Sequence, residues 1–133
     1  MHYFAYGSNL NMKQMNERVP GNKPKFTAVL PNYKLFFVGY SRNWKGGVAS
    51  IKPFKGQKVE GAVYEITEDQ FKKLDRFEDY GFSYDHLKVT VWTDSDDQVE
   101  AITYIKKEQS PETQPSTEYL SVIRQGYRDW GIE

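Results

Sequence analysis

Stretches that favour β-strands outnumber helical patterns in this chain, and the two kinds of element do not alternate. Apolar, aromatic and β-branched residues predict strands over residues 2–6, 26–38, 48–54, 59–66, 84–92 and 99–106. Pro31 lies within the second stretch, which therefore predicts either two strands or one interrupted edge strand. Several strands with only a few short helices between them indicate an α+β fold and argue against a doubly wound parallel sheet.

The connections between these stretches carry residues typical of turns and loops. The sequence Lys55-Gly56-Gln57 predicts a β-hairpin between the third and fourth strands, and the acidic run at 94–97 predicts the turn between the last two. Residues 39–47 and 108–115 have the composition of loops, and the second is too short for a domain linker. We therefore expect a single domain over residues 1–133, an ordinary length for one hydrophobic core.

Three helices are predicted from capping residues and from apolar residues at helical spacing. The first follows Asn9 or Asn11, either of which can cap it. The second begins after Thr67, where Gln70 completes a capping-box pattern, and it extends to about Glu78. The third is capped by Ser116 and carries apolar residues at intervals of three or four, namely Tyr119, Ile123, Tyr127 and Trp130, with Leu120 beside them.

Charge and composition exclude several classes of partner. The 18 Lys and Arg residues balance 18 Asp and Glu residues, so no net charge draws the chain to nucleic acid or to an anionic membrane. The absence of cysteine excludes disulfides, thiolate metal sites and cysteine nucleophiles. We find neither a membrane-spanning apolar run nor a signal region. We therefore expect a cytoplasmic protein, a monomer or weak homodimer, whose partner is a small molecule.

The two histidines, His2 and His86, have no carboxylate at a ligand spacing. We therefore expect no metal site and no cofactor. His86 is expected on the surface of its strand.

Glu78 is the acidic residue that the helical periodicity singles out. At roughly 100° per residue, Phe71, Leu74 and Phe77 define an apolar stripe, and Glu78 lies about 40° from its centre. Asp75 lies farther off, at the margin of the stripe. A carboxylate at the C-terminus of a helix also faces the negative end of the macrodipole, which favours its protonated form. The pattern predicts a proton-holding acid on the core side, whereas a helix that frays before Glu78 leaves it solvated.

Residues 4–10, with the sequence Phe-Ala-Tyr-Gly-Ser-Asn-Leu, lead from a strand through a glycine turn to a helix start. Such a turn leaves backbone N–H groups directed at a neighbouring ligand, and glycine permits its close approach. These donors and one acid suffice for acyl chemistry without a protein nucleophile. The same residues also fit a plain strand-to-helix corner capped by Asn9, so spacing alone leaves both interpretations open. The glycine pattern is not that of a P-loop.

These segments resemble the gamma-glutamyl cyclotransferase family, including its gamma-glutamylamine cyclotransferase branch, over nearly the full chain. Residues 4–10 resemble the substrate loop of the family, and Leu74-Asp75-Arg76-Phe77-Glu78 resembles the segment with its catalytic glutamate. Three more segments resemble its Gly-Gly segment, the strand before its acidic helix and the segment with a substrate-contacting tyrosine, namely residues 44–49, 61–64 and 115–119. Asp79 departs from the pattern, because the family usually has glycine directly after this glutamate. A second carboxylate beside Glu78 would raise its pKa if the side chains approach.

The resemblance implies a small mixed β-barrel flanked by short helices, with residues 6–10 and Glu78 lining one cavity. It implies the cyclisation of a gamma-glutamyl amide, which releases 5-oxoproline and a free amine or amino acid, with Glu78 as general acid and base. The implied substrate-binding residues are Tyr6, Gly7, Ser8, Asn9, Leu10, Tyr84, Tyr104 and Tyr119. The sequence leaves the amine side of the substrate open.

Tyr84 presents a difficulty for this assignment. Strict alternation along its strand groups it with His86 and Lys88, opposite Leu87 and Val89. Either a bulge intervenes or both faces of the strand are covered.

Two other classes of function remain open. The first is a non-catalytic domain that binds a small ligand on the same fold. The second is an interaction domain, which predicts a large exposed apolar patch in place of a closed pocket.

Overall fold

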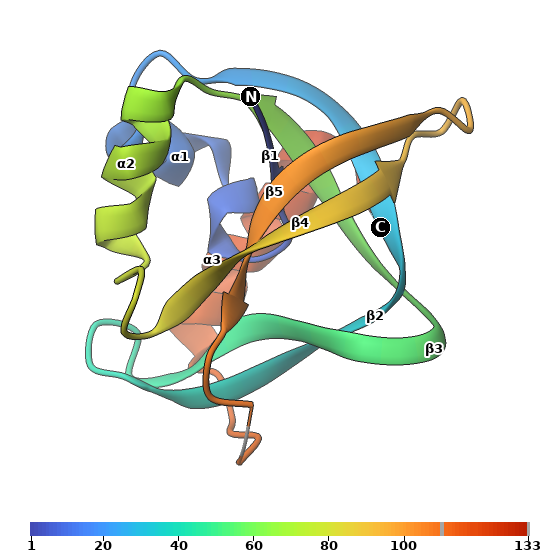
Figure 1. Cartoon of the computed structure of the whole chain (residues 1–133). Helices are drawn as coiled ribbons and strands as arrows, with labels where there is room; N and C mark the ends of the chain where they lie inside the picture. The colour runs from blue at the N-terminus through green and yellow to red at the C-terminus, as the bar shows by residue number, and fades with distance from the viewer. Residues whose placement is uncertain (110, 133) are drawn as a thin grey trace.

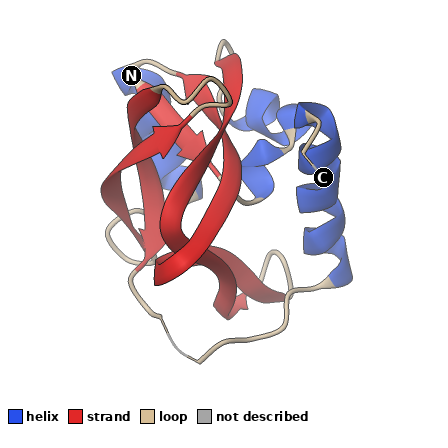
Figure 2. Cartoon of the chain, turned by 90° about the vertical axis from the view of Figure 1, so that its right-hand side faces the viewer, coloured by secondary structure: helices blue, strands red, loops and turns tan. Residues whose placement is uncertain are grey.

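The computed structural model describes residues 1–109 and 111–132, in which five strands close into a barrel (Figure 1). The elements in chain order are β1 (His2–Ala5), the 3₁₀ helix η1 (Ser8–Leu10), α1 (Met12–Arg18), β2 (Lys23–Ser41), β3 (Gly46–Glu65), α2 (Glu68–Phe77), β4 (Tyr84–Trp92), β5 (Gln98–Lys106) and α3 (Thr117–Trp130). The strands follow one another around the barrel in the order β1-β3-β2-β4-β5, and the helices lie outside them (Figure 2). The predicted α+β class and small barrel with flanking helices are confirmed. Ser110, in the predicted loop at 108–115, and Glu133 lie outside the described residues.

The barrel is mixed because one of its strand contacts is parallel. β1 pairs with β3 in antiparallel register, and so do β2 with β3 and β4 with β5. β1 meets β5 in parallel register at Tyr3 and Ile102, and this contact closes the barrel. The closure brings the ring of Tyr3 to 5.8 Å from that of Tyr104, beside the start of the glycine turn.

The predicted hairpin at residues 55–57 is wrong. Residues 46–65 form the single strand β3, and both of its halves pair with β2. Gly56, with φ of 89°, and Asn32, with φ of 63°, occupy facing bends, where the Gly56 N–H donates to Asn32 Oδ1 at 3.2 Å. The glycine therefore bends the strand instead of reversing it, and the register shifts between Pro31 and Tyr33. The predicted loop at 39–47 is also shorter than expected, because β2 and β3 both extend into it.

The three predicted helices are present with capped N-termini. Asn11 Oδ1 accepts a hydrogen bond from the Gln14 N–H at 3.0 Å, which selects Asn11 over Asn9 as the cap of α1. Thr67 and Gln70 form the predicted capping box of α2, and Ser116 caps α3. Within the described ranges, no helix has the length and apolar character needed to cross a membrane.

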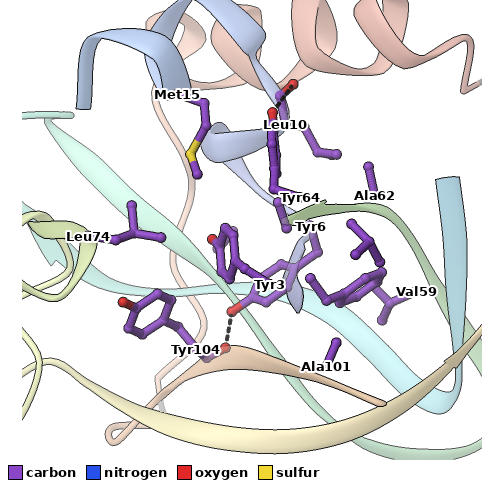
Figure 3. Packing of buried hydrophobic residues seen from close by; sticks show 14 of the residues in the cluster. Tyr3, Tyr6, Leu10, Met15, Val59, Ala62, Tyr64, Leu74, Ala101 and Tyr104 are labelled. Atoms are coloured by element: carbon purple, nitrogen blue, oxygen red, sulfur yellow. Dashed lines mark hydrogen bonds between the residues drawn. The ribbon is translucent and has the colours of Figure 1, made fainter. Parts of the chain in front are cut away.

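The core fills the barrel and continues under the helices (Figure 3). η1 is held between the barrel and α3, because the Tyr64 hydroxyl donates to Asn9 O at 2.8 Å and Trp130 Nε1 donates to Leu10 O at 3.0 Å. α3 crosses η1 at Gly126, where a Cβ atom would lie only 2.6 Å from Leu10 Cβ. These contacts fix the position of the turn that precedes η1.

Candidate active site

A small cavity, called here the inner cavity, lies where the glycine turn, the end of α2 and the barrel strands meet. Its volume is about 30 Å³, and its lining residues are Tyr3, Tyr6, Gly7, Ser8, Asn9, Ala49, Glu78, Tyr84, Tyr104 and Tyr119. Every residue that the sequence predicted for the site lines this cavity except Leu10. Leu10 is fully buried in the core against α3, where it supports the turn from behind.

A wider pocket, called here the outer pocket, adjoins the inner cavity and has a volume of about 260 Å³. The two spaces share Ser8, Glu78, Tyr84 and Tyr119 as lining residues. The inner cavity has room for about two water molecules, so a ligand as large as an amino-acid derivative extends into the outer pocket. Glu78 therefore lies at the boundary between a narrow inner space and an open outer one.

The glycine turn presents backbone donors to the inner cavity. Within residues 1–109 and 111–132, no hydrogen bond engages the backbone N–H groups of Gly7, Ser8 and Asn9, since η1 begins there. A Cβ atom on Gly7 would lie 3.1 Å from Ala49 Cβ and 3.8 Å from the Tyr119 hydroxyl, both of which line the cavity. Glycine at position 7 therefore keeps this space open.

Glu78 is the C-cap of α2, and its side chain is 16% exposed. Its Oε1 accepts a hydrogen bond from Asn9 Nδ2 at 3.0 Å and lies 3.4 Å from Arg18 Nη1. The helical periodicity thus predicted the position of this side chain correctly, but it wrongly placed Phe77 on the buried stripe. Phe77 is 54% exposed, and its ring lies 5.1 Å from the Arg18 guanidinium carbon.

Burial raises the pKa of Glu78 above its ordinary value, because desolvation disfavours the carboxylate. Arg18, Asn9 and Lys106 act in the opposite direction by stabilising the charged form, and Asp75 raises the pKa further by repulsion. The net direction is upward. Glu78 therefore holds its proton more strongly than a solvated glutamate does.

The Asp79 carboxylate forms a different contact from the approach to Glu78 that its position in the sequence suggested. Its Oδ2 accepts a hydrogen bond from the Ser83 hydroxyl at 3.0 Å, and Asp75 is the acid that raises the pKa of Glu78. The backbone of Asp79 has φ of 52°, in the left-handed region that favours glycine. This conformation accounts for the glycine that the family usually has at this place.

The tyrosine hydroxyls around the cavity fall into two groups. Three of them donate to groups of the protein: Tyr6 to Tyr104 O at 2.7 Å, Tyr84 to Ala49 O at 2.7 Å and Tyr104 to Asp75 Oδ1 at 2.6 Å. These three rings form walls of the cavity. Figure 3 marks the hydrogen bond from the Tyr6 hydroxyl to the main-chain oxygen of Tyr104.

Tyr3 and Tyr119 form the second group. The Tyr3 hydroxyl accepts from Asn9 Nδ2 at 3.0 Å, and the Tyr119 hydroxyl accepts from the Ala49 N–H at 2.9 Å. Neither hydroxyl donates to another of the described residues, so both protons are available to a ligand. Burial raises the pKa of both hydroxyls, which keeps them protonated as donors.

The two faces of β4 are buried over different parts of the strand, which resolves the difficulty posed by strict alternation. The register with β5 runs without a shift from Tyr84 opposite Lys106 to Trp92 opposite Gln98, so no bulge intervenes. Tyr84 lines the cavity at the start of the strand, where Asp85 on the other face is exposed. Val89 and Val91 on that other face are buried farther along the strand.

His86 is not the surface residue that the sequence predicted. Its Nε2 lies 2.7 Å from Asp75 Oδ1, and its ring stacks on Tyr80 at 3.7 Å between centroids. Asp75 thus joins His86 to Tyr104 beneath α2. Among the residues that the structure describes, no group of three or more His, Asp or Glu side chains is arranged for a metal ion.

Sequence reasoning missed Tyr3, Ala49 and Arg18. Tyr3 lies in β1 two residues before Ala5, and its alternation with Phe4 gives no sign of which face meets the cavity. Arg18 reaches Glu78 from the last turn of α1 across 60 residues of sequence, and no local pattern predicts that contact.

Comparison with known proteins identifies the family of this chain. Residues 3–127 match the model of the family described as gamma-glutamyl cyclotransferase, AIG2-like. The chain is 30% identical to gamma-glutamylcyclotransferase of Bos taurus over 135 residues, and the alignment covers 98% of this chain and 71% of that protein. For gamma-glutamylcyclotransferase of Homo sapiens the identity is 30% over 137 residues, with the same coverage.

Solved structures show the same relationship. One named gamma-glutamyl cyclotransferase superposes with a TM-score of 0.93 at 28% identity, over 98% of this chain and 80% of that chain. The chain therefore belongs to the gamma-glutamyl cyclotransferase, AIG2-like family, as its residues predicted. The enzyme class predicted from the resemblance is confirmed at this level.

Proposed function

We propose that this chain cyclises a gamma-glutamyl amide and releases 5-oxoproline together with a free amine or amino acid. The observation that carries the proposal is the position of the Glu78 carboxylate on the same cavity as the backbone N–H groups of Gly7, Ser8 and Asn9. The bovine and human relatives are named for this kind of reaction, which supports it.

In the proposed reaction the nucleophile is the α-amino nitrogen of the substrate. This nitrogen attacks the γ-carbonyl carbon of the same molecule, so that a new C–N bond closes a five-membered ring and the C–N bond to the leaving group breaks. Glu78 takes a proton from the α-ammonium group and gives one to the leaving nitrogen, so that a single carboxylate serves both steps. A pKa raised by burial suits a group that must both accept and return a proton.

The glycine turn and two hydroxyls supply hydrogen-bond donors. These donors stabilise the negative charge that develops on the γ-carbonyl oxygen, or they bind the carboxylate of the substrate. We assign this role to the N–H groups of Gly7, Ser8 and Asn9, together with the O–H groups of Tyr3 and Tyr119. Donors fixed in a buried site stabilise such charge without reorganisation during the reaction. The walls formed by Tyr6, Tyr84 and Tyr104 hold the glutamyl chain folded, which brings its amine to its own carbonyl.

The test is an assay of purified protein on a small panel of gamma-glutamyl compounds, with 5-oxoproline measured by mass spectrometry. The proposal predicts 5-oxoproline and the free amine in equal amounts from at least one compound. A protein that binds the compounds but turns none of them over would be the non-catalytic ligand-binding domain that remains the alternative.

A further inference from the structure

The outer pocket contains two cationic side chains whose surroundings differ. Arg18 lies 3.4 Å from Glu78 Oε1, and its Nη1 also donates to Asn9 Oδ1 at 3.2 Å. Its charge is therefore already balanced by the catalytic carboxylate. Lys106 lines the same pocket from the end of β5.

Lys106 makes no such ion pair, although its charge also stabilises the charged form of Glu78. Within the described ranges no carboxylate lies within 4.0 Å of its Nζ, although the next residue, Lys107, pairs with Asp85 at 3.7 Å. The Lys106 ammonium lies 5.4 Å from the centroid of the Tyr84 ring, on the side of the outer pocket. Asp79 also lines this pocket, where its carboxylate accepts from the Ser83 hydroxyl and, among the described residues, forms no ion pair with Lys106. A half-buried cation that makes no direct ion pair favours the binding of an anion.

The position of the pocket relative to Glu78 limits where that anion lies in the substrate. The leaving nitrogen must reach Glu78 at the boundary of the two spaces, so the leaving group occupies the outer pocket. In an amino acid, the carboxylate carbon is two bonds, or about 2.5 Å, from the nitrogen. The carboxylate of a leaving amino acid therefore enters the pocket that Lys106 lines.

We propose that Lys106 binds a carboxylate on the leaving side of the substrate, so that this chain prefers gamma-glutamyl derivatives of amino acids over those of neutral amines. The inference rests on the proposed function and adds to it a residue that determines specificity. A carboxamide has nearly the shape of a carboxylate but lacks its charge, so the two leaving groups differ mainly in the property that Lys106 recognises.

The experiment compares gamma-glutamylalanine with gamma-glutamylalaninamide by the kcat/KM for 5-oxoproline formation. Wild-type protein is expected to favour the carboxylate by about 10- to 100-fold, the range of a charge-assisted hydrogen bond. In Lys106→Met this ratio should fall to near one, and in Lys106→Arg most of it should remain. Lys107→Met, which removes the neighbouring cation paired with Asp85, is the matched control and should keep the wild-type ratio.

The ratio of the two kcat/KM values, carboxylate over carboxamide, separates the possible outcomes. A wild-type ratio near one, or a ratio that persists in Lys106→Met, would overturn the role of Lys106 and leave the proposed function intact. The absence of 5-oxoproline from both compounds and from the wider panel would contradict the proposed function itself. The wild-type ratio and Lys106→Arg still decide the question if Lys106→Met fails to fold.

Discussion

Asn9 and Glu78 are joined by a hydrogen bond of 3.0 Å from Asn9 Nδ2 to Glu78 Oε1, although 69 residues separate them in the sequence. The bond ties the glycine turn, whose backbone donors line the inner cavity, to the acid at the end of α2. Asn9 Oδ1 in turn accepts from Gln14 Nε2 and Arg18 Nη1, both at 3.2 Å. The donors and the acid are therefore held as one unit.

Glu78→Gln tests the role of the acid with little change in shape. The amide oxygen can still accept from Asn9, so the turn should keep its position, but the side chain no longer carries a proton between nitrogens. We expect kcat to fall by about 100-fold or more. Circular dichroism and the thermal midpoint should show a folded protein. Turnover equal to wild type in the purified variant would exclude Glu78 as the proton carrier.

Arg18→Met tests the electrostatic environment of Glu78. Arg18 lowers the pKa of Glu78, so its removal should raise that pKa further above the ordinary value. The carboxylate form is needed to accept a proton, so activity is lost as the pH falls through this pKa. The acidic limb of the kcat/KM profile should therefore move to higher pH. Lys13→Met, an exposed cation on the same helix, is the control, and an identical limb in wild type and Arg18→Met would refute the assignment.

Tyr119→Phe and Tyr84→Phe form a matched pair. Each variant deprives one backbone group of Ala49 of its hydrogen bond, so similar costs in stability of about 1–3 kcal/mol are expected. Only Tyr119→Phe also removes a hydroxyl proton that is available to a ligand. We expect it to lose about 100-fold in kcat, with a clearly smaller loss for Tyr84→Phe. Equal losses in the two variants would show that the Tyr119 hydroxyl does not act on the substrate.

Gly126→Ala tests how η1 is held. Alanine in the interior of a helix ordinarily stabilises it by about 1 kcal/mol relative to glycine. Here the added Cβ would lie 2.6 Å from Asn11 N and from Leu10 Cβ, so α3 and η1 must separate. We expect a net destabilisation of about 1–3 kcal/mol in urea unfolding. A variant more stable than wild type would mean that α3 and η1 are not in close contact at Gly126.

The parts of the site that follow from local chemistry could be predicted from the sequence. The helical period and the capping box located Glu78 at the end of α2, and the glycine turn predicted the free donors at residues 7–9. The hairpin at 55–57 failed because a glycine with positive φ fits a strand bend as well as a reversal, and only the pairing of both halves of β3 with β2 distinguishes them. Arg18 and Tyr3 were missed because their contacts depend on packing between distant segments.

The identity of the nucleophile is the most direct test of the account. The reaction is run in ¹⁸O-labelled water with a gamma-glutamyl amide that the protein turns over, and beside it with the same compound acetylated on its α-amine. Attack by the substrate's own nitrogen predicts 5-oxoproline without solvent oxygen, and no turnover of the acetylated compound, whose γ-amide is unchanged. Labelled glutamate as the first product, or release of the amine from the acetylated compound, would show instead that Glu78 activates water for hydrolysis.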